Sequence, residues 1–166
     1  MKFILKILGS IVLLSSSYYA YYVHFDYRFE EISKNKVYKS ALIDPDDLAY
    51  YLSKYKIKTV IDLLDPGVQD SLNPAKQNEV DSENKAINAY NFATNSDVKH
   101  VHIPSGQVPT KETLIKFFEV LDDKTNYPVL IHCYHGTGRA AIYSAIYRIE
   151  YEKYKNEDAR EKHAYL

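Results

Sequence analysis

One short segment combines residue types that together suit attack on a phosphate group. Residues 128–149 read PVLIHCYHGTGRAAIYSAIYRI and include the only cysteine of the chain, Cys133, followed by Gly136, Gly138 and Arg139. The backbone N–H groups of such a glycine-rich turn can form a nest for an anion, and a helix that starts there adds partial positive charge. Arg139 can bind two phosphate oxygens through its planar guanidinium group. The same positive field favours the thiolate of Cys133, which would attack the phosphorus atom and form a cysteinyl-phosphate.

Alternating strands and helices are expected to position this segment. Apolar, β-branched stretches predict strands at 36–41, 57–64, 98–104 and 127–133, and amphipathic stretches predict helices at 44–56, 76–92, 110–121 and 138–154. Asp44 and Thr110 have the residue types of helix N-caps. Strands that alternate with helices predict an α/β fold with a central, mainly parallel sheet flanked by helices. Catalytic groups of such folds lie at the carboxyl ends of the strands, where Cys133 follows its strand.

The composition limits the classes of partner and the role of the cysteine. The chain has 166 residues, enough for one domain, and a formal net charge of −1, so no broad positive field favours nucleic acid. A single cysteine excludes an intramolecular disulfide but leaves a buried apolar thiol, a reactive thiol or a metal ligand open. The residues His100, His102, His132, Cys133 and His135 have zinc-ligand types, but their spacing matches no closed structural site. We therefore expect no metal, and we expect His100 and His102 to be ordinary strand residues.

The first 23 residues have the pattern of a targeting or membrane segment. They read MKFILKILGSIVLLSSSYYAYYV, with Lys2 and Lys6 ahead of an apolar stretch that ends in tyrosines suited to a membrane interface. An uncleaved membrane anchor is the main expectation, and a cleaved secretory signal or an ordinary amphipathic helix are the alternatives. Because the lysines precede the span, the positive-inside rule predicts that the rest of the chain lies outside the cytoplasm, anchored or exported. Residues 24–35 are then expected to be a connector, and residues 36–166 the catalytic domain.

The segment at 132–140 resembles the signature of the cysteine-based protein tyrosine phosphatases. That signature is His-Cys, five residues and Arg, usually followed by Ser or Thr, and here it reads HCYHGTGRA. The surrounding residues, about 36–155, resemble in order the small dual-specificity-like phosphatases of bacteria. The resemblance implies Cys133 as the nucleophile, Arg139 as the group that stabilises the transition state, and His132 as a residue that orients the loop. It also implies a phosphate cradle formed by the backbone of Tyr134, His135, Gly136, Thr137, Gly138 and Arg139.

Two departures from the family pattern affect the expected chemistry. Ala140 stands where the family has a hydroxyl that stabilises the departing cysteine, so we expect slower hydrolysis of the phosphoenzyme. The loop after the strand at 98–104 has no aspartate, although many relatives carry their general acid there. We therefore expect Asp62 or Asp65 to protonate the leaving group, and His135 is a further candidate.

The resemblance implies a phosphatase without cofactor or metal that hydrolyses phosphomonoesters through a cysteinyl-phosphate. Phosphotyrosine or phosphoserine/threonine in proteins is the expected substrate. Two alternatives stay open: a weak pseudophosphatase that binds a phosphorylated ligand, and a phosphatase of small phosphoesters such as inositol phosphates. The membrane is the other expected partner, through the N-terminal helix.

Overall fold

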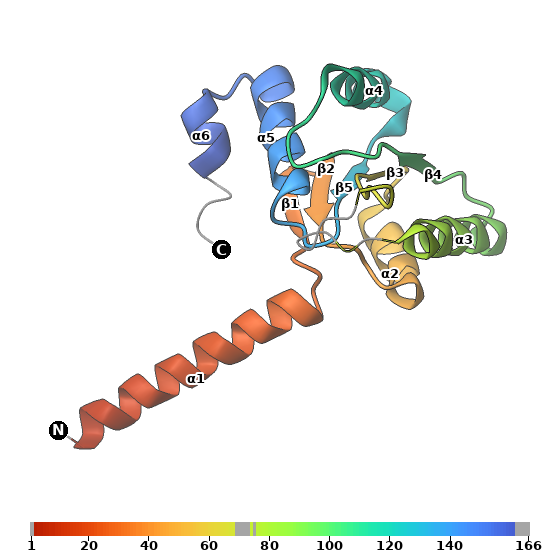
Figure 1. Cartoon of the computed structure of the whole chain (residues 1–166). Helices are drawn as coiled ribbons and strands as arrows, with labels where there is room; N and C mark the ends of the chain where they lie inside the picture. Colours follow the sequence, from red (N-terminus) through yellow and green to blue (C-terminus); the bar gives the residue numbers. More distant parts are fainter. Residues whose placement is uncertain (1, 69–73, 75, 162–166) are drawn as a thin grey trace.

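A five-stranded sheet with helices on both faces positions the cysteine-containing loop. The computed structural model describes residues 2–68, 74 and 76–161 (Figure 1). The elements in chain order are α1 (Lys2–His24), β1 (Glu30–Ser33), β2 (Val37–Ser40), α2 (Pro45–Tyr55), β3 (Thr59–Asp62), α3 (Gln77–Thr94), β4 (Lys99–His102), α4 (Lys111–Asp122), a 3₁₀ turn (Lys124–Asn126), β5 (Val129–His132), α5 (Arg139–Glu152) and α6 (Asn156–Glu161). The strand order is β1-β2-β5-β3-β4, and only the β1–β2 pair is antiparallel. The predicted α/β fold with a mainly parallel sheet is confirmed.

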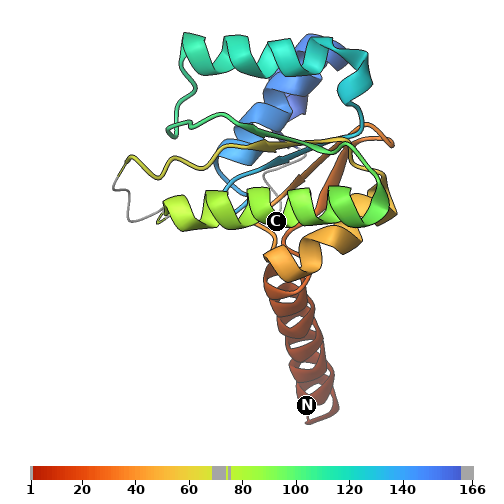
Figure 2. The same cartoon turned by 90° about the vertical axis from the view of Figure 1, so that its right-hand side faces the viewer.

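The two faces of the sheet carry separate apolar cores. On one face, Ile61 and Ile131 pack with Phe117 of α4 and Tyr143 of α5. On the other face, the neighbouring strand residues Val60 and Leu130 pack with side chains of α2 and α3. Figure 2 shows α4 and α5 on one side of the sheet and α2 and α3 on the other. Because successive strand residues point to opposite faces, the parity of each position decides which core a side chain enters.

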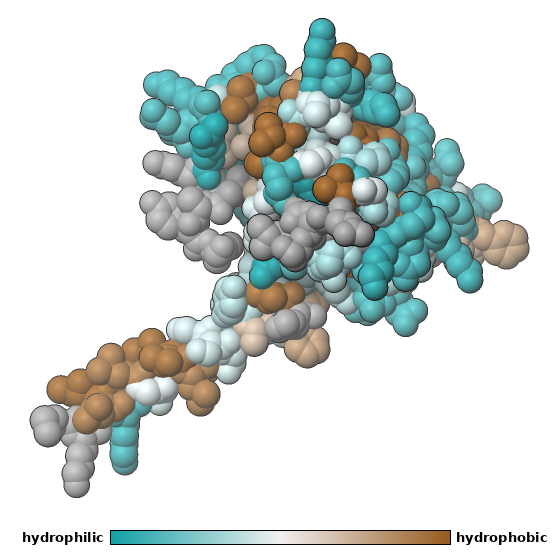
Figure 3. Space-filling view, viewed as in Figure 1, coloured by the Kyte–Doolittle hydropathy of each residue, from teal (hydrophilic) through white to brown (hydrophobic). Residues whose placement is uncertain are grey.

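α1 leaves the domain as a long exposed helix. Residues Phe3–Val23 have a mean hydropathy of 1.5 and are long enough to cross a bilayer. Figure 3 shows apolar side chains along this helix. Leu13 and Leu14 of α1 are 68% and 69% exposed. A solvated helix would not keep such side chains in water without cost, so α1 has the composition of a membrane anchor or of a signal sequence.

Two segments differ from the predicted organisation. Residues 24–35 were expected to be a connector, but they contain β1, which pairs with β2 at the edge of the sheet. The helix predicted at 138–154 corresponds to α5, which ends at Glu152 and is capped by Lys153 with a left-handed φ of 61°, and the further helix α6 follows. Ala159 of α6 is fully buried, so this short helix packs against the domain.

Candidate active site

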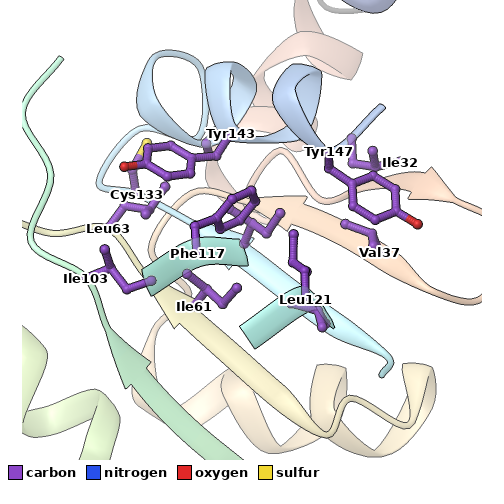
Figure 4. Close-up of a cluster of buried hydrophobic side chains, with 13 residues drawn as sticks. Ile32, Val37, Ile61, Leu63, Ile103, Phe117, Leu121, Cys133, Tyr143 and Tyr147 are labelled. Atoms are coloured by element: carbon purple, nitrogen blue, oxygen red, sulfur yellow. The ribbon is translucent and has the colours of Figure 1, made fainter. Parts of the chain in front are cut away.

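The loop between β5 and α5 is shaped by one glycine. Gly136 has a φ of +71°, and a Cβ atom there would lie 2.5 Å from the backbone nitrogen of Ala41 and 2.9 Å from the carbonyl oxygen of Ser40. No other residue type fits this position, because both the backbone angle and the close approach require the absence of a side chain. The loop is therefore pressed against the end of β2. Figure 4 shows Cys133, which is 2% exposed, beside Tyr143 at the edge of the core.

Residues outside the motif also bond to carbonyls of this loop. The backbone N–H of Leu42 donates to the carbonyl of Tyr134 at 3.3 Å. The Nη1 of Arg28, from the segment between α1 and β1, donates to the carbonyl of His135 at 2.7 Å. The loop is therefore bonded to the chain that follows β2 and to the chain that follows α1.

The guanidinium group of Arg139 is buried and fixed by two carbonyls. Arg139 is 2% exposed, and its Nη1 donates to the carbonyls of Leu63 and Ser105, the latter at 2.9 Å. Ser105 is itself fixed, because its hydroxyl lies 2.9 Å from the hydroxyl of Tyr143. The loops that follow β3 and β4 thus hold the plane of the guanidinium at the start of α5, beside the loop that Cys133 opens.

A buried ion-pair network lies behind the loop, on the α3 face of the sheet. Glu83 is 1% exposed, and its Oε2 lies 3.0 Å from Nε2 of His132 and 3.0 Å from Nε2 of His100. Asp62 adds a second carboxylate, 3.8 Å from His132 and 3.7 Å from His100. Since a carboxylate oxygen only accepts, His100 donates from its Nε2 to Glu83. The Nε2 of His132 faces the same oxygen as an ion pair, and this contact holds the ring that directly precedes Cys133.

The pKa values of this network favour its charged form. Burial alone would raise the pKa of Glu83, but the charge of His132 and the hydrogen bond from His100 outweigh it and bring the pKa to about 2. Burial alone would lower the pKa of His100, yet its bonds to Asp62 and Glu83 raise the pKa to about 9. The pKa of His132 is also raised, because the charge of Glu83 outweighs the effect of burial. At neutral pH Glu83 is therefore a carboxylate and His100 an imidazolium, and the raised pKa of His132 favours its protonated form.

The same network is the place where the described residues offer a possible metal site. Oxygen and nitrogen atoms of Asp62, Glu83 and His132 all lie within 4.8 Å of one another. These ligand types would suit zinc. However, the Glu83 oxygen already receives the N–H of His100 and forms an ion pair with His132, and the opposite charges compensate one another. Ion pairs therefore explain this arrangement, and the expectation that the enzyme needs no metal stays a prediction.

The structure separates the three candidates for the general acid. Asp62 is fully buried and shares the α3 face with His132, whereas Cys133 packs in the core on the α5 face. Its carboxylate accepts the N–H of Leu64 and faces the histidines, so the expectation that Asp62 protonates a leaving group is not supported by its position. Asp65 is half-buried in the loop that follows β3. His135 is exposed on the loop between β5 and α5 itself.

The residues just before Asp65 contact the loop between β5 and α5. The carbonyl of Leu63, two residues earlier, binds Arg139, and the side chain of Leu64 packs near Tyr134. The Oδ1 of Asp65 accepts the N–H of Gly67 at 3.2 Å, which orients the carboxylate within a tight turn. Of the two aspartates, Asp65 is the one whose loop contacts the candidate site.

Some site residues were not foreseen from the sequence. Glu83 occupies the buried stripe of α3 with Val80 and Ile87, and a carboxylate in an apolar helical stripe is a detectable signal for a buried ion pair. Ser105 and Arg28 act through their positions in distant loops, and no local pattern marks them. His100, expected to be an ordinary strand residue, belongs to the network instead.

Replacing Glu83 with glutamine should destabilise the fold and change its pH dependence. Because the folded-state pKa values of His100 and His132 lie above their ordinary 6.5, their stabilisation is fully present below pH 6.5. It is lost as the pH rises, through about 9 for His100. We expect the wild-type unfolding free energy to fall between these two pH values, and the Glu83→Gln variant to lose about 3 kcal/mol below pH 6.5.

Urea unfolding of both proteins across this pH range checks the expectation. The matched control is Asp81→Asn, which removes an exposed carboxylate from the same helix and should leave both the stability and its pH slope within about 0.5 kcal/mol of wild type. Equal pH slopes for wild type and Glu83→Gln would show that the two histidines do not owe their protonation to Glu83.

The solved structures that this chain resembles are phosphatases. TpbA from P. aeruginosa is 22% identical with a TM-score of 0.59, over 84% of this chain and 74% of that one; it has also been solved with phosphotyrosine. The core catalytic domain of the PP-IP phosphatase Siw14 from S. cerevisiae is 18% identical with a TM-score of 0.58, over 82% and 76% of the two chains. At these identities the likeness establishes a shared fold.

A family model gives the more specific match, whereas no curated protein matches the sequence. The model describes a DSP-PTPase phosphatase fused to NAD⁺ kinase, and it covers residues 23–165, which include the catalytic loop, the buried network and all five strands. By that match this chain belongs to the DSP-PTPase family, and so to the cysteine-based phosphatases that its HCYHGTGRA segment resembles.

Proposed function

We propose that this phosphatase hydrolyses phosphomonoesters through Cys133 and Arg139. The observation that carries the proposal is the loop that joins them, the catalytic loop of residues 133–138. It runs from the cysteine after β5 to a buried arginine at the start of α5, and this arginine makes two hydrogen bonds to carbonyls. The loop backbone binds the phosphate, as nests at helix N-termini bind anions. His132, held by Glu83, orients the start of the loop.

The reaction proceeds in two displacements. The thiolate of Cys133 forms an S–P bond while the ester P–O bond breaks, and the leaving oxygen takes a proton. Water then attacks phosphorus, the S–P bond breaks, and inorganic phosphate leaves with the thiolate restored. Arg139 binds two equatorial oxygens and stabilises the charge of both transition states. We assign the proton donor to Asp65, whose loop contacts Arg139 and Tyr134, and keep His135 as the alternative.

Phosphate esters on proteins and on small molecules both remain within this proposal. The structure of TpbA with phosphotyrosine and the PP-IP phosphatase Siw14 represent the two substrate classes on the shared fold. We also propose that α1 anchors the enzyme in a membrane with the domain outside the cytoplasm, because the lysines precede the apolar stretch.

Ala140 favours a second candidate function, in which the protein binds a phosphorylated ligand and hydrolyses its phosphoenzyme only slowly. Ala140 is fully buried at the start of α5, where a hydroxyl in the family stabilises the departing thiolate. The Ala140→Ser variant should therefore hydrolyse its phosphoenzyme about tenfold to a hundredfold faster, the value of one hydrogen bond to a charged group.

Rapid-quench kinetics with 4-nitrophenyl phosphate, in the presence of EDTA, test both functions. The wild type should release one equivalent of nitrophenol in a burst and then turn over slowly, and Ala140→Ser should turn over faster with a smaller burst. The control Ala141→Ser adds the same hydroxyl one position later, on a half-buried residue, and should keep the wild-type burst. A wild type that shows neither burst nor turnover would contradict the phosphatase and favour phosphate binding alone.

A further inference from the structure

We propose that the substrate carries an apolar chain, so that the enzyme dephosphorylates a lipid phosphate monoester at the membrane that holds α1. This inference rests on the proposed phosphatase function and names its substrate class. Two independent features carry it: the place of the catalytic loop relative to α1, and an apolar groove that begins at that loop.

The chain that follows α1 binds the catalytic loop directly. Arg28 lies four positions after His24, the last residue of α1, and donates to the carbonyl of His135 at 2.7 Å. The carbonyl of Tyr27 accepts the N–H of Ala41, at the end of β2, at 2.7 Å. α1 therefore joins the domain beside the catalytic loop, as Figures 1 and 2 show.

The short connection keeps the catalytic loop close to the membrane surface. Four residues of extended chain span at most about 14 Å. The tyrosines Tyr18, Tyr19, Tyr21 and Tyr22 near the end of α1 suit the interface between lipid and water. The polar headgroup layer on each side of a bilayer is about 5–7 Å thick. A phosphate group that projects from a lipid headgroup thus lies within reach of the loop, whereas a soluble substrate gains nothing from this arrangement.

A groove of about 660 Å³ begins at the catalytic loop and runs along α5. Thr137 and Gly138 form its end at the loop, and one side of α5 forms its wall, with Ala141, Ile142, Ala145, Ile146 and Ile149. Val108 and Ile142, which also line it, are 80% and 38% exposed. Figure 3 shows apolar atoms in this region, over α5 between the polar surfaces of α6 and α4. The volume is in the range of pockets that bury small ligands.

The chemistry of the groove favours an apolar chain over the other substrate classes. Arg160 is its only charged lining residue among those described, and an inositol polyphosphate would need several cations. A phosphopeptide would place polar backbone groups against a wall of isoleucine and alanine, where their desolvation is not compensated. A methylene chain attached to the phosphate oxygen gains about 0.8 kcal/mol for each buried CH₂ group.

A series of soluble monoalkyl phosphates tests the groove. The full chain, held in phosphatidylcholine nanodiscs, is assayed with ethyl, butyl, hexyl and octyl phosphate, and with 4-nitrophenyl phosphate as the reference. We expect kcat/KM to rise with chain length by up to about fourfold for each methylene. We also expect dioleoyl phosphatidic acid in the same nanodiscs to be hydrolysed faster than glycerol 3-phosphate added to the solution.

Two variants distinguish the groove from simple partition of long chains into the bilayer. Ile142→Asn places an amide in the groove and should flatten the dependence on chain length. Ile115→Asn changes a somewhat more accessible isoleucine on α4, 47% exposed and outside the groove, and should preserve the dependence on chain length. If both variants keep the slope, partition explains the effect and the groove does not bind the chain.

The possible failures of the two proposals are distinguishable. Turnover of 4-nitrophenyl phosphate with no dependence on chain length would overturn the lipid substrate and leave the phosphatase standing. Hydrolysis of a tyrosine phosphopeptide faster than octyl phosphate or phosphatidic acid would assign the site to proteins instead. If neither the wild type nor the two variants hydrolyse 4-nitrophenyl phosphate, the proposed phosphatase function is overturned, and the lipid inference with it.

Discussion

Replacement of Cys133 with serine should abolish turnover of 4-nitrophenyl phosphate, with a loss of about 10⁴-fold or more in kcat, as for other enzymes that lose their nucleophile. The serine hydroxyl is not ionised at neutral pH, so it is a far weaker nucleophile than the thiolate and should not form the covalent intermediate at a measurable rate. Cys133 is 2% exposed and packs at the edge of the core, and serine is nearly the same size. The fold and the phosphate-binding backbone should therefore persist without the reaction.

Steady-state kinetics and a binding measurement together check this result. Inorganic phosphate should raise the thermal unfolding midpoints of Cys133→Ser and of the wild type alike, because the loop amides and Arg139 are unchanged in the variant. A variant that keeps activity within tenfold of wild type would show that another group attacks the phosphorus. A variant that no longer responds to phosphate would show that the loop conformation depends on the thiol, and the loss of turnover would then have a structural cause.

The sheet and most helices could be predicted because their signals are local. Asp44 accepts the N–H of Asp46 as an N-cap, and Thr110 accepts that of Thr113 in the same role. Buried strands of parallel sheets are continuous apolar runs, and β3 and β5 are both fully buried. A segment whose apolar pattern follows from its own burial can therefore be assigned as a strand or helix from its residues alone.

The missed elements have weak local signals and depend on partners far away in the chain. β1 contains a single buried apolar residue, Ile32, between charged and polar side chains, and an edge strand needs only one partner to form. The break between α5 and α6 occurs at Lys153, a residue that does not usually adopt positive φ.

The candidate site likewise contains residues that local sequence predicts and residues that only the fold brings together. The motif that contains Cys133 and Arg139 encodes its own strand, turn and helix, so the loop could be placed from the sequence. Asp62 was predicted as a candidate acid from its position at the end of a strand, and the face to which its side chain points was not considered. It pairs in register with His132 across the sheet, so it points away from the face that Cys133 enters. The partner of His132 is Glu83 of α3, and only the folded structure brings those residues together.

Replacement of Arg139 with lysine should lower kcat/KM for 4-nitrophenyl phosphate by about 10³-fold, although the charge is kept, which is the lower end of what a transition-state arginine contributes. A guanidinium group can bind two carbonyls on one edge and two phosphate oxygens on another, because its donors are fixed in one plane. In this structure one nitrogen of Arg139 already binds the carbonyls of Leu63 and Ser105. A lysine ammonium has three donors on one atom and cannot serve both carbonyls and the phosphate from the same position.

The matched control is Arg148→Lys, since Arg148 is also a buried arginine of α5 and donates to the carbonyl of Ile32 at 3.2 Å. Both variants should lower the thermal unfolding midpoint, because each loses bonds to a carbonyl that is far away in sequence. Only Arg139→Lys should lose catalysis and weaken competitive inhibition by inorganic phosphate. Equal losses of kcat/KM in the two variants would mean that Arg139 acts through the packing of α5. Loss in Arg139→Lys alone would mean that the carbonyls of Leu63 and Ser105 hold a phosphate-binding group in place, so that the loops after β3 and β4 contribute to catalysis without touching the substrate.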